Sequence, residues 1–124
     1  MIWFSVALGG ALGSVARHGV NVMFARSVVP ASPYATATVN LIGSLVIGFL
    51  AGAIASGRLA MDPQTRALVF VGILGGFTTF SSFTLDTLTL VHSGRHLLAA
   101  GNVFGQLALG LIAVFLGYWL SSWQ

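Results

Sequence analysis

The segment from Gly72 to Thr84 reads GILGGFTTFSSFT, and its order of residue types decides how the chain folds. An apolar stretch leads into two adjacent glycines, Gly75 and Gly76, and then into a dense run of hydroxyl side chains. A continuous helix is unfavourable here because glycine weakens a helix interior and Ser and Thr have only modest helix propensity. We therefore predict a helix that is interrupted near Gly75 and Gly76.

The residues around this segment are too apolar for a protein surrounded by water. Of 124 residues, 56% are hydrophobic and 6% are charged, whereas soluble domains carry about 25% charged residues. A helix needs roughly 20 apolar residues to cross a bilayer. We predict an all-α membrane protein of one domain, residues 1–124, without a cleavable leader. Its four transmembrane helices are expected at about residues 2–25, 34–56, 63–90 and 96–120.

Small residues recur at four-residue spacing in every expected helix. This spacing allows membrane helices to approach closely, so we expect a compact bundle, with oligomerisation or ordinary helix packing as open alternatives. The pairs are Gly9 and Gly13, Gly48 and Gly52, Gly72 and Gly76, and Gly101 and Gly105.

The arginines outside the helix centres are balanced across the membrane. Arg58 and Arg66 fall on one side and Arg26 and Arg95 on the other. Because the Lys/Arg bias of short loops sets orientation, the chain is predicted to insert either way and to form an antiparallel dimer. The alternative is that the N-terminal amine or Asp62 favours one orientation. Arginines scattered singly indicate contact with the lipid bilayer and no nucleic-acid partner.

Uncharged polar side chains form one stripe on each of two expected helices. Thr36, Asn40 and Ser44 follow at four-residue spacing in the second helix, as do Asn102 and Gln106 in the fourth. Amides and hydroxyls offer hydrogen-bond donors without a carboxylate to repel an anion. The alternative is interhelical hydrogen bonding, which is common in membrane bundles.

The interrupted third helix adds further candidates for ion contact. Freed carbonyls suit a small hard cation, and freed N–H groups suit an anion. Phe80 and Phe83 share a helix face, and aromatic ring edges are partly positive, although plain packing is an alternative. Arg17 and Asp86 lie inside expected spans, so we expect either a mutual ion pair or a water-accessible partner for each.

Three segments together resemble the CrcB/Fluc fluoride channel family. They are GGALGSVAR at residues 9–17, TATVNLIGS at 36–44 and GGFTTFSSF at 75–83. The third is the most specific, and the resemblance extends over the full length.

The resemblance implies an antiparallel, dual-topology homodimer with two fluoride pathways and a structural sodium ion at the dimer centre. It implies that Gly75 and Thr78 supply backbone carbonyls to sodium. It also implies a set of fluoride-pathway residues: Asn40 as the pore amide, Phe80 and Phe83 as the pore aromatics, and Thr36, Ser81, Asn102 and Gln106 as polar-track positions. The sequence departs from the family pattern at His18, Asp86, Asn102 and Gln106.

The function expected from this resemblance is passive, fluoride-selective export across the bacterial inner membrane, without enzymatic chemistry. One alternative is a dual-topology exporter of cationic drugs, but such transporters need a carboxylate in the first helix, and residues 2–25 contain none. A second alternative is a structural membrane protein whose polar stripes only join helices.

Overall fold

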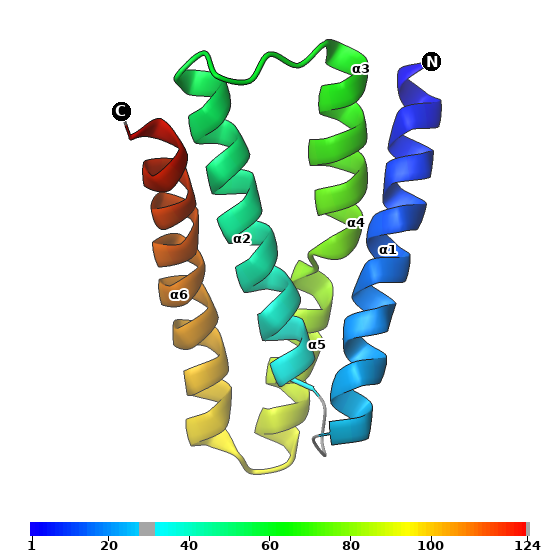
Figure 1. Cartoon of the computed structure of the whole chain (residues 1–124). Coiled ribbons are helices and arrows are strands. Elements are labelled where there is room, and N and C mark those ends of the chain that lie inside the picture. Colours follow the sequence, from blue (N-terminus) through cyan, green and yellow to red (C-terminus); the bar gives the residue numbers. More distant parts are fainter. Residues whose placement is uncertain (28–31, 124) are drawn as a thin grey trace.

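A computed structural model describes residues 1–27 and 32–123, and within them every regular element is helical (Figure 1). The third expected helix is divided into four parts. In chain order the elements are α1 (Ile2–Ser27), α2 (Tyr34–Ala55), α3 (Pro63–Arg66), the π-helix η1 (Ala67–Leu74), α4 (Gly75–Phe77), α5 (Phe80–His92) and α6 (His96–Ser122).

Local signals in the sequence account for where the helices begin and end. Gly57 (φ 74°) follows α2 and Gly94 (φ 71°) follows α5, and this left-handed conformation favours glycine. Asp62 caps α3, because its Oδ1 accepts hydrogen bonds from the amides of Gln64 at 2.9 Å and Thr65 at 3.1 Å. Pro63 occupies the first helical turn, where it needs no amide hydrogen.

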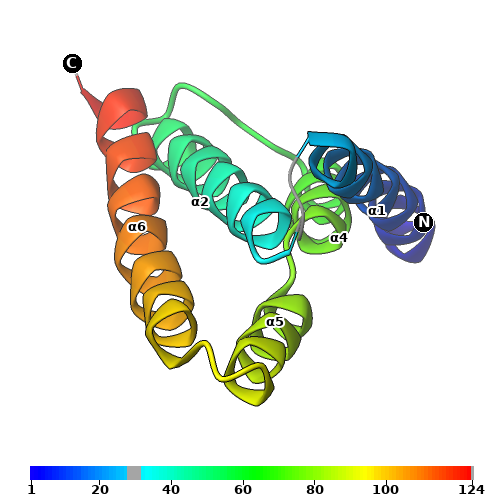
Figure 2. The ribbon, with the colours of Figure 1, turned by 90° about the horizontal axis from the view of Figure 1, so that it is seen from below.

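The helices pack mainly in two pairs. α1 lies along η1 and α4, α2 lies along α6, and α5 packs against the first half of α6. Seen along the bundle, α5 is displaced sideways from α4 (Figure 2). Before the interruption the third helix therefore packs against α1, and after it the chain continues as α5 beside α6.

Glycines make the contact between α1 and the third helix close. A Cβ at Gly9 would lie 2.9 Å from the Cα of Gly72, and a Cβ at Gly76 would lie 2.6 Å from the carbonyl oxygen of Gly10. Any larger residue would push against backbone atoms that cannot rotate away. The close approach predicted from the glycine spacing is confirmed here.

Glycines also make the contact between α2 and α6 close, with one exception. A Cβ at Gly48 would meet the backbone of Val114, and one at Gly117 would meet that of Leu45. By contrast, a Cβ at Gly101 or Gly105 would meet nothing within 4 Å. Within the described part of this chain the glycine pair of α6 makes no close helix contact, so a role for this pair in oligomerisation stays a prediction.

The break in the third helix does not fall at the two glycines. Gly75 has helical angles (φ −64°, ψ −36°), and Gly75 and Gly76 both belong to α4. Helical geometry ends at Thr78 (φ −83°, ψ 160°) and Thr79 (φ −155°, ψ 117°). The break therefore begins two residues after the predicted glycines, and close packing against α1 accounts for glycine at position 76.

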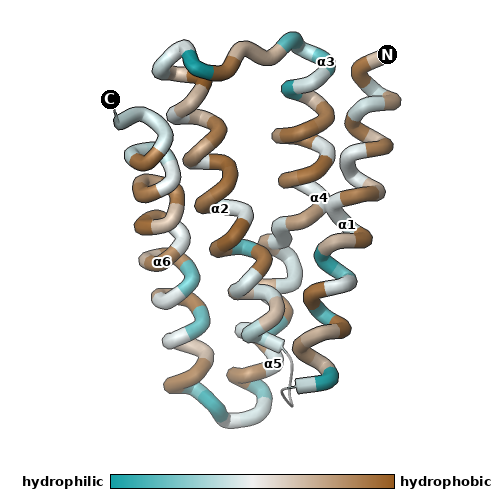
Figure 3. Tube along the Cα trace, in the orientation of Figure 1, coloured by the Kyte–Doolittle hydropathy of each residue, from teal (hydrophilic) through white to brown (hydrophobic). Residues whose placement is uncertain are grey.

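The lengths and compositions of these helices suit a bilayer. Tyr34–Ala55, Pro63–His92 and His96–Ser122 are long and apolar enough to cross a membrane. α1 has 26 residues but is less apolar, because its second half contains Arg17, His18 and Asn21; Figure 3 shows hydrophilic positions there. Large apolar side chains cover the outside of the bundle, with Phe104 and Phe115 each 71% exposed.

Candidate functional site

The side chain of Asn40 takes the place of helical hydrogen bonds at the break. In a continuous helix the amide of Thr79 would donate to the carbonyl of Gly75, but it donates instead to Oδ1 of Asn40 at 2.8 Å. Nδ2 of Asn40 donates in return to the carbonyl of Thr79 at 3.1 Å. A residue of α2 thus holds both backbone groups of Thr79.

This exchange leaves the Gly75 carbonyl without its helical donor. Gly75, Thr78 and Thr79 line an open cavity of about 380 Å³ together with Asn40 and Phe80. The described residues contain no group of three or more His, Asp or Glu side chains able to hold a metal ion. The oxygens that line this cavity are therefore uncharged and come from backbone carbonyls, hydroxyl groups and the Asn40 amide.

Thr79 also begins α5. Its Oγ1 accepts a hydrogen bond from the amide of Ser82 at 3.2 Å and lies 3.1 Å from Oγ of Ser82 and 3.3 Å from Oγ of Ser81. Ser81 therefore lies beside the break, in a small cluster of hydroxyl groups. Ser and Thr are favoured at such N-cap positions.

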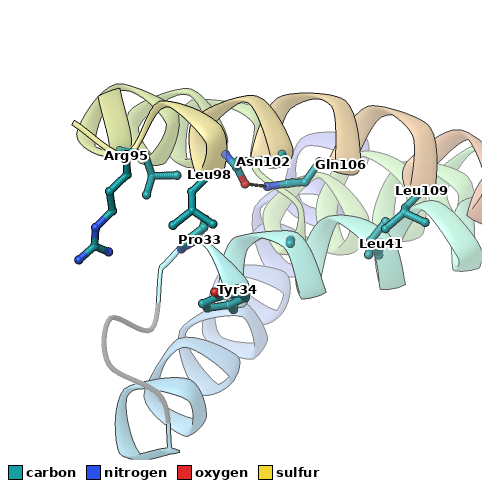
Figure 4. Close-up of a pocket in the computed structure, with 12 residues that line it drawn as sticks. Pro33, Tyr34, Leu41, Arg95, Leu98, Asn102, Gln106 and Leu109 are labelled. Carbon is teal, nitrogen blue, oxygen red and sulfur yellow. Dashed lines mark hydrogen bonds between the residues drawn. The ribbon is translucent and has the colours of Figure 1, made fainter. Parts of the chain in front are cut away.

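A line of amides continues from the break into α6. Nδ2 of Asn40 also donates to Oε1 of Gln106 at 2.9 Å, and Nε2 of Gln106 donates to Oδ1 of Asn102 at 2.8 Å. Asn102 is buried and donates to Oγ1 of Thr87 at 2.9 Å. Asn102 and Gln106 line a cavity of about 250 Å³ between α2 and α6 (Figure 4).

The two predicted stripes therefore meet. The interhelical hydrogen bonds that the sequence left open as an alternative are present between α2 and α6 and between α6 and α5. Thr36 is buried on α2, one turn before Asn40. A role for these residues in an ion pathway stays a prediction.

Phe80 and Phe83 lie together, as their spacing predicts, with ring centroids 5.5 Å apart and planes inclined by 43°. Their surroundings differ. Phe83 is 8% exposed, whereas Phe80 is 73% exposed beside the cavity at the break. The exposed Phe80 ring and the Gly75 carbonyl therefore line the same cavity.

Asp86 is not held by Arg17 in the described part of the chain. Its Oδ1 accepts a hydrogen bond from Oγ of Ser32, and its Oδ2 is buried without a hydrogen-bond partner among residues 1–27 and 32–123. The direct ion pair that the sequence suggested between these two residues is not formed. Asp86 instead links α5 to the residues that precede α2.

Two residues of this network were not predicted from the sequence. Thr79 and Thr87 were not singled out as site residues, because each was one hydroxyl among many between Thr78 and Thr89. No feature of the sequence distinguished Thr87 from its neighbours, because its Oγ1 donates to the carbonyl four residues earlier, that of Phe83 at 2.9 Å, as Thr89 does to that of Leu85.

Comparison with known proteins shows the relatives of this chain. Residues 4–118 match the family model described as CrcB-like protein, Camphor Resistance (CrcB). A "Fluoride-specific ion channel FluC" from Opitutus terrae is 46% identical, over 94% of this chain and 89% of the relative. Proteins with the same name from Parabacteroides distasonis and Paracoccus denitrificans are 45% and 46% identical, covering 92% and 93% of this chain and 88% and 90% of the relatives.

Proposed function

The chain belongs to the CrcB family, and we propose that it is a fluoride-selective ion channel that exports fluoride passively from the cytoplasm through the bacterial inner membrane. The observation that carries this proposal is similarity over nearly the whole chain to proteins named fluoride-specific ion channels. No enzymatic chemistry is part of it.

The chemistry of the amide line suits a strongly hydrated anion. A channel must replace the water of its ion with groups of the protein, and Asn40, Gln106 and Asn102 carry amide N–H donors without a fixed charge. Both N–H groups of Asn40 are engaged by the Thr79 carbonyl and Gln106. Fluoride would therefore replace one of these acceptors when it passes Asn40.

The same groups argue against a proton-coupled exporter of cations. Amides and hydroxyls do not titrate near neutral pH, so the line from Asn40 to Thr87 supplies no protonation cycle that could drive transport. A carboxylate would also be needed to hold a cationic substrate, and the line from Asn40 to Thr87 contains none. Passive movement of an anion is the simpler use of this site.

The working form that we propose is an antiparallel homodimer with two fluoride pathways. Phe80 is 73% exposed beside the cavity at the break, and a second copy would cover it and place its ring along the pathway. The balanced arginines favour insertion in both orientations. The proposed pathway residues are Asn40, Phe80, Phe83, Thr36, Ser81, Asn102 and Gln106.

A sodium ion at the centre of this dimer fits the backbone at the break. The Gly75 carbonyl lacks its helical donor because the Thr79 amide bonds to Asn40, and Thr78 is extended. Two copies would bring the carbonyls of Gly75 and Thr78 together as four oxygens. These ligands carry no charge, so they suit a monovalent cation with a structural role.

Fluoride efflux from liposomes tests the proposed function. Purified protein is reconstituted at low density into vesicles loaded with potassium fluoride, valinomycin is added, and external fluoride is followed with an electrode. We expect rapid efflux of fluoride and none of chloride from matched vesicles. Efflux no faster than from protein-free vesicles would contradict the proposal and favour a purely structural membrane protein.

Labelling of the termini tests the dual topology. Tags at either end should be accessible from both sides of the membrane in one preparation. Two lysines added to the loop that carries Arg58 should shift the population to one orientation and lower activity. Labelling of the unmodified protein from one side only would refute an antiparallel dimer.

A further inference from the structure

The amide line forms one directed chain of hydrogen bonds. Each member donates to the next: Asn40 to Gln106, Gln106 to Asn102, Asn102 to Thr87, and Thr87 to the carbonyl of Phe83. The chain starts at the helix break and returns to the backbone of α5. It therefore connects Asn40 with the residue whose ring is predicted to line the pathway.

A single backbone group sets the direction of this chain. The amide of Thr79 can only donate, so the atom of Asn40 that faces it, at 2.8 Å, must be the oxygen. Nδ2 of Asn40 then faces Gln106, so the atom of Gln106 that accepts this hydrogen bond must be Oε1. By the same reasoning, Oδ1 of Asn102 accepts from Gln106 and Nδ2 of Asn102 donates to Thr87.

The other end of the chain is set by Thr87. Its hydroxyl hydrogen goes to the carbonyl of Phe83 at 2.9 Å, so its oxygen is left to accept the bond from Asn102. A second contact of Asn102, to the Phe83 carbonyl, is long at 3.5 Å. Asn102 is 8% exposed, and a buried donor without a partner is costly. Thr87 is thus the main acceptor that keeps Asn102 in place.

Counting the N–H groups along the chain shows which donor is left over. Asn40 uses both of its N–H groups, and Asn102 directs both of its own at Thr87 and Phe83. Gln106 uses one, towards Asn102. Within the described residues its second N–H has no acceptor, and Gln106 lines the cavity of about 250 Å³ (Figure 4).

We propose that Thr87 is a positioning residue, which acts through Asn102 to hold the Gln106 amide with one N–H free for the anion. This inference rests on the proposed function. Thr87 does not touch the ion. It accepts from Asn102, whose oxygen then engages the other N–H of Gln106 and prevents that side chain from rotating. Preorganised donors bind an anion without the cost of ordering them at each passage.

Substitution of Thr87 tests this role in the full-length, reconstituted protein. Thr87→Val keeps the shape but removes the acceptor, so fluoride efflux should fall about tenfold, the factor of one ordinary hydrogen bond. Thr87→Ser restores the hydroxyl and should stay within about twofold of the unmodified rate. Thr89→Val is the matched control, because Thr89 lies on the same helix and its hydroxyl likewise bonds the carbonyl four residues earlier, that of Leu85.

A double substitution separates positioning from packing. Gln106→Met removes the amide that Thr87 is proposed to hold, so adding Thr87→Val to it should lower efflux no further. If Thr87 only stabilised the fold, the losses of efflux caused by Gln106→Met and by Thr87→Val would multiply in the double variant. Elution as a dimer is checked for every variant, and Thr87→Cys, which keeps the volume but accepts weakly, replaces Thr87→Val if that variant does not assemble.

The outcomes distinguish this inference from the proposed function. Unmodified protein without fluoride efflux overturns both. Active unmodified protein with Thr87→Val as fast as Thr89→Val, or with Thr87→Val and Thr87→Ser equally slow, overturns the positioning role alone. A slow Thr87→Val, a fast Thr87→Ser and no added loss in the Gln106→Met background support it.

Discussion

Asn40 and Thr79 are paired through two hydrogen bonds, one from the Thr79 amide to Oδ1 of Asn40 and one from Nδ2 of Asn40 to the Thr79 carbonyl. A side-chain amide has the same donor and acceptor as a peptide group, so Asn40 pairs with Thr79 as a neighbouring strand would. This pairing satisfies an extended backbone inside the membrane, where an unsatisfied group costs several kcal/mol. The helix break and the proposed pathway therefore depend on the same residue.

Replacing Asn40 by Asp tests its place in the pathway. Oδ1 could still accept from Thr79, but a carboxylate oxygen would face the Thr79 carbonyl and Oε1 of Gln106. A charge at the membrane centre costs about 2.5–3.5 kcal/mol, and it would repel fluoride, so we expect efflux to fall roughly a hundredfold while the dimer persists. Asn21→Asp on the exposed side of α1 is the control. Efflux near the unmodified rate in a verified Asn40→Asp dimer would remove Asn40 from the pathway.

The two phenylalanines should respond differently to substitution by Ile, which removes the positive ring edge. Phe80→Ile should slow efflux roughly tenfold and lower the unfolding temperature less than Phe83→Ile does, because the Phe80 ring makes few contacts within its own chain, where it is 73% exposed. Phe83→Ile should slow efflux to a similar extent and also lower the unfolding temperature, because Phe83 is buried. Phe115→Ile, at a similarly exposed site on α6, should change neither the efflux rate nor the unfolding temperature. Unchanged efflux in both Phe80 and Phe83 variants would assign these rings to packing.

The helix ends could be predicted from the sequence because their signals are local. Gly57, Gly94 and the Asp62-Pro63 pair each act within a few residues of a helix end. The break could be placed only approximately, since its position depends on Asn40, which is 39 residues away in the chain. Propensity alone pointed to the glycines, whereas a tertiary hydrogen bond moves the break to Thr78 and Thr79.

The site was predictable to a similar extent. The spacing of Asn102 and Gln106 predicted that they share a face, and they are hydrogen-bonded to each other at 2.8 Å. Their partner Thr87 was not predictable, because nothing in the sequence shows which of several hydroxyls α6 meets. The Ser32 contact of Asp86 was missed for the same reason.

Two neighbouring glycines on α1 give a matched test of helix packing. A Cβ at Gly9 would come within 3.0 Å of backbone atoms of Gly72 and Ile73, whereas one at Gly10 would meet nothing within 4 Å. Gly9→Ala should therefore destabilise the protein by about 1–3 kcal/mol, while Gly10→Ala should be neutral or gain up to about 1 kcal/mol from helix propensity. Thermal unfolding in detergent measures both. Equal effects would show that α1 does not pack on η1 as described.

The cap of α3 should make stability depend on pH below neutrality. Hydrogen bonds from the Thr65 hydroxyl, at 2.6 Å, and from the amides of Thr65 and Gln64 lower the pKa of Asp62 below its usual 3.8. A lowered pKa adds stability at pH values above the ordinary 3.8, and that stability is lost as the pH falls through the folded pKa. The unfolding temperature of Asp62→Ala should lie below that of the unmodified protein at pH 7, with the gap narrowing below about pH 4. A gap that stays constant with pH would exclude this linkage.

The proposed sodium site makes a prediction about the substitution of Gly75. Because Gly75 is helical and its nearest neighbour for a Cβ is the Phe70 carbonyl at 3.8 Å, Gly75→Val should leave the chain folded. The added methyl groups would instead enter the cavity at the break and keep a second copy from bringing its carbonyls close. Thr78→Ser removes only a methyl group that faces Gly43 and leaves the carbonyl in place.

We expect the unmodified protein and Thr78→Ser to form dimers that dissociate more readily when sodium is replaced by N-methylglucamine. Gly75→Val should form weak dimers whose stability does not respond to sodium. Dimer stability that is independent of sodium in the unmodified protein would refute the site, while fluoride efflux would still report separately on the pathway.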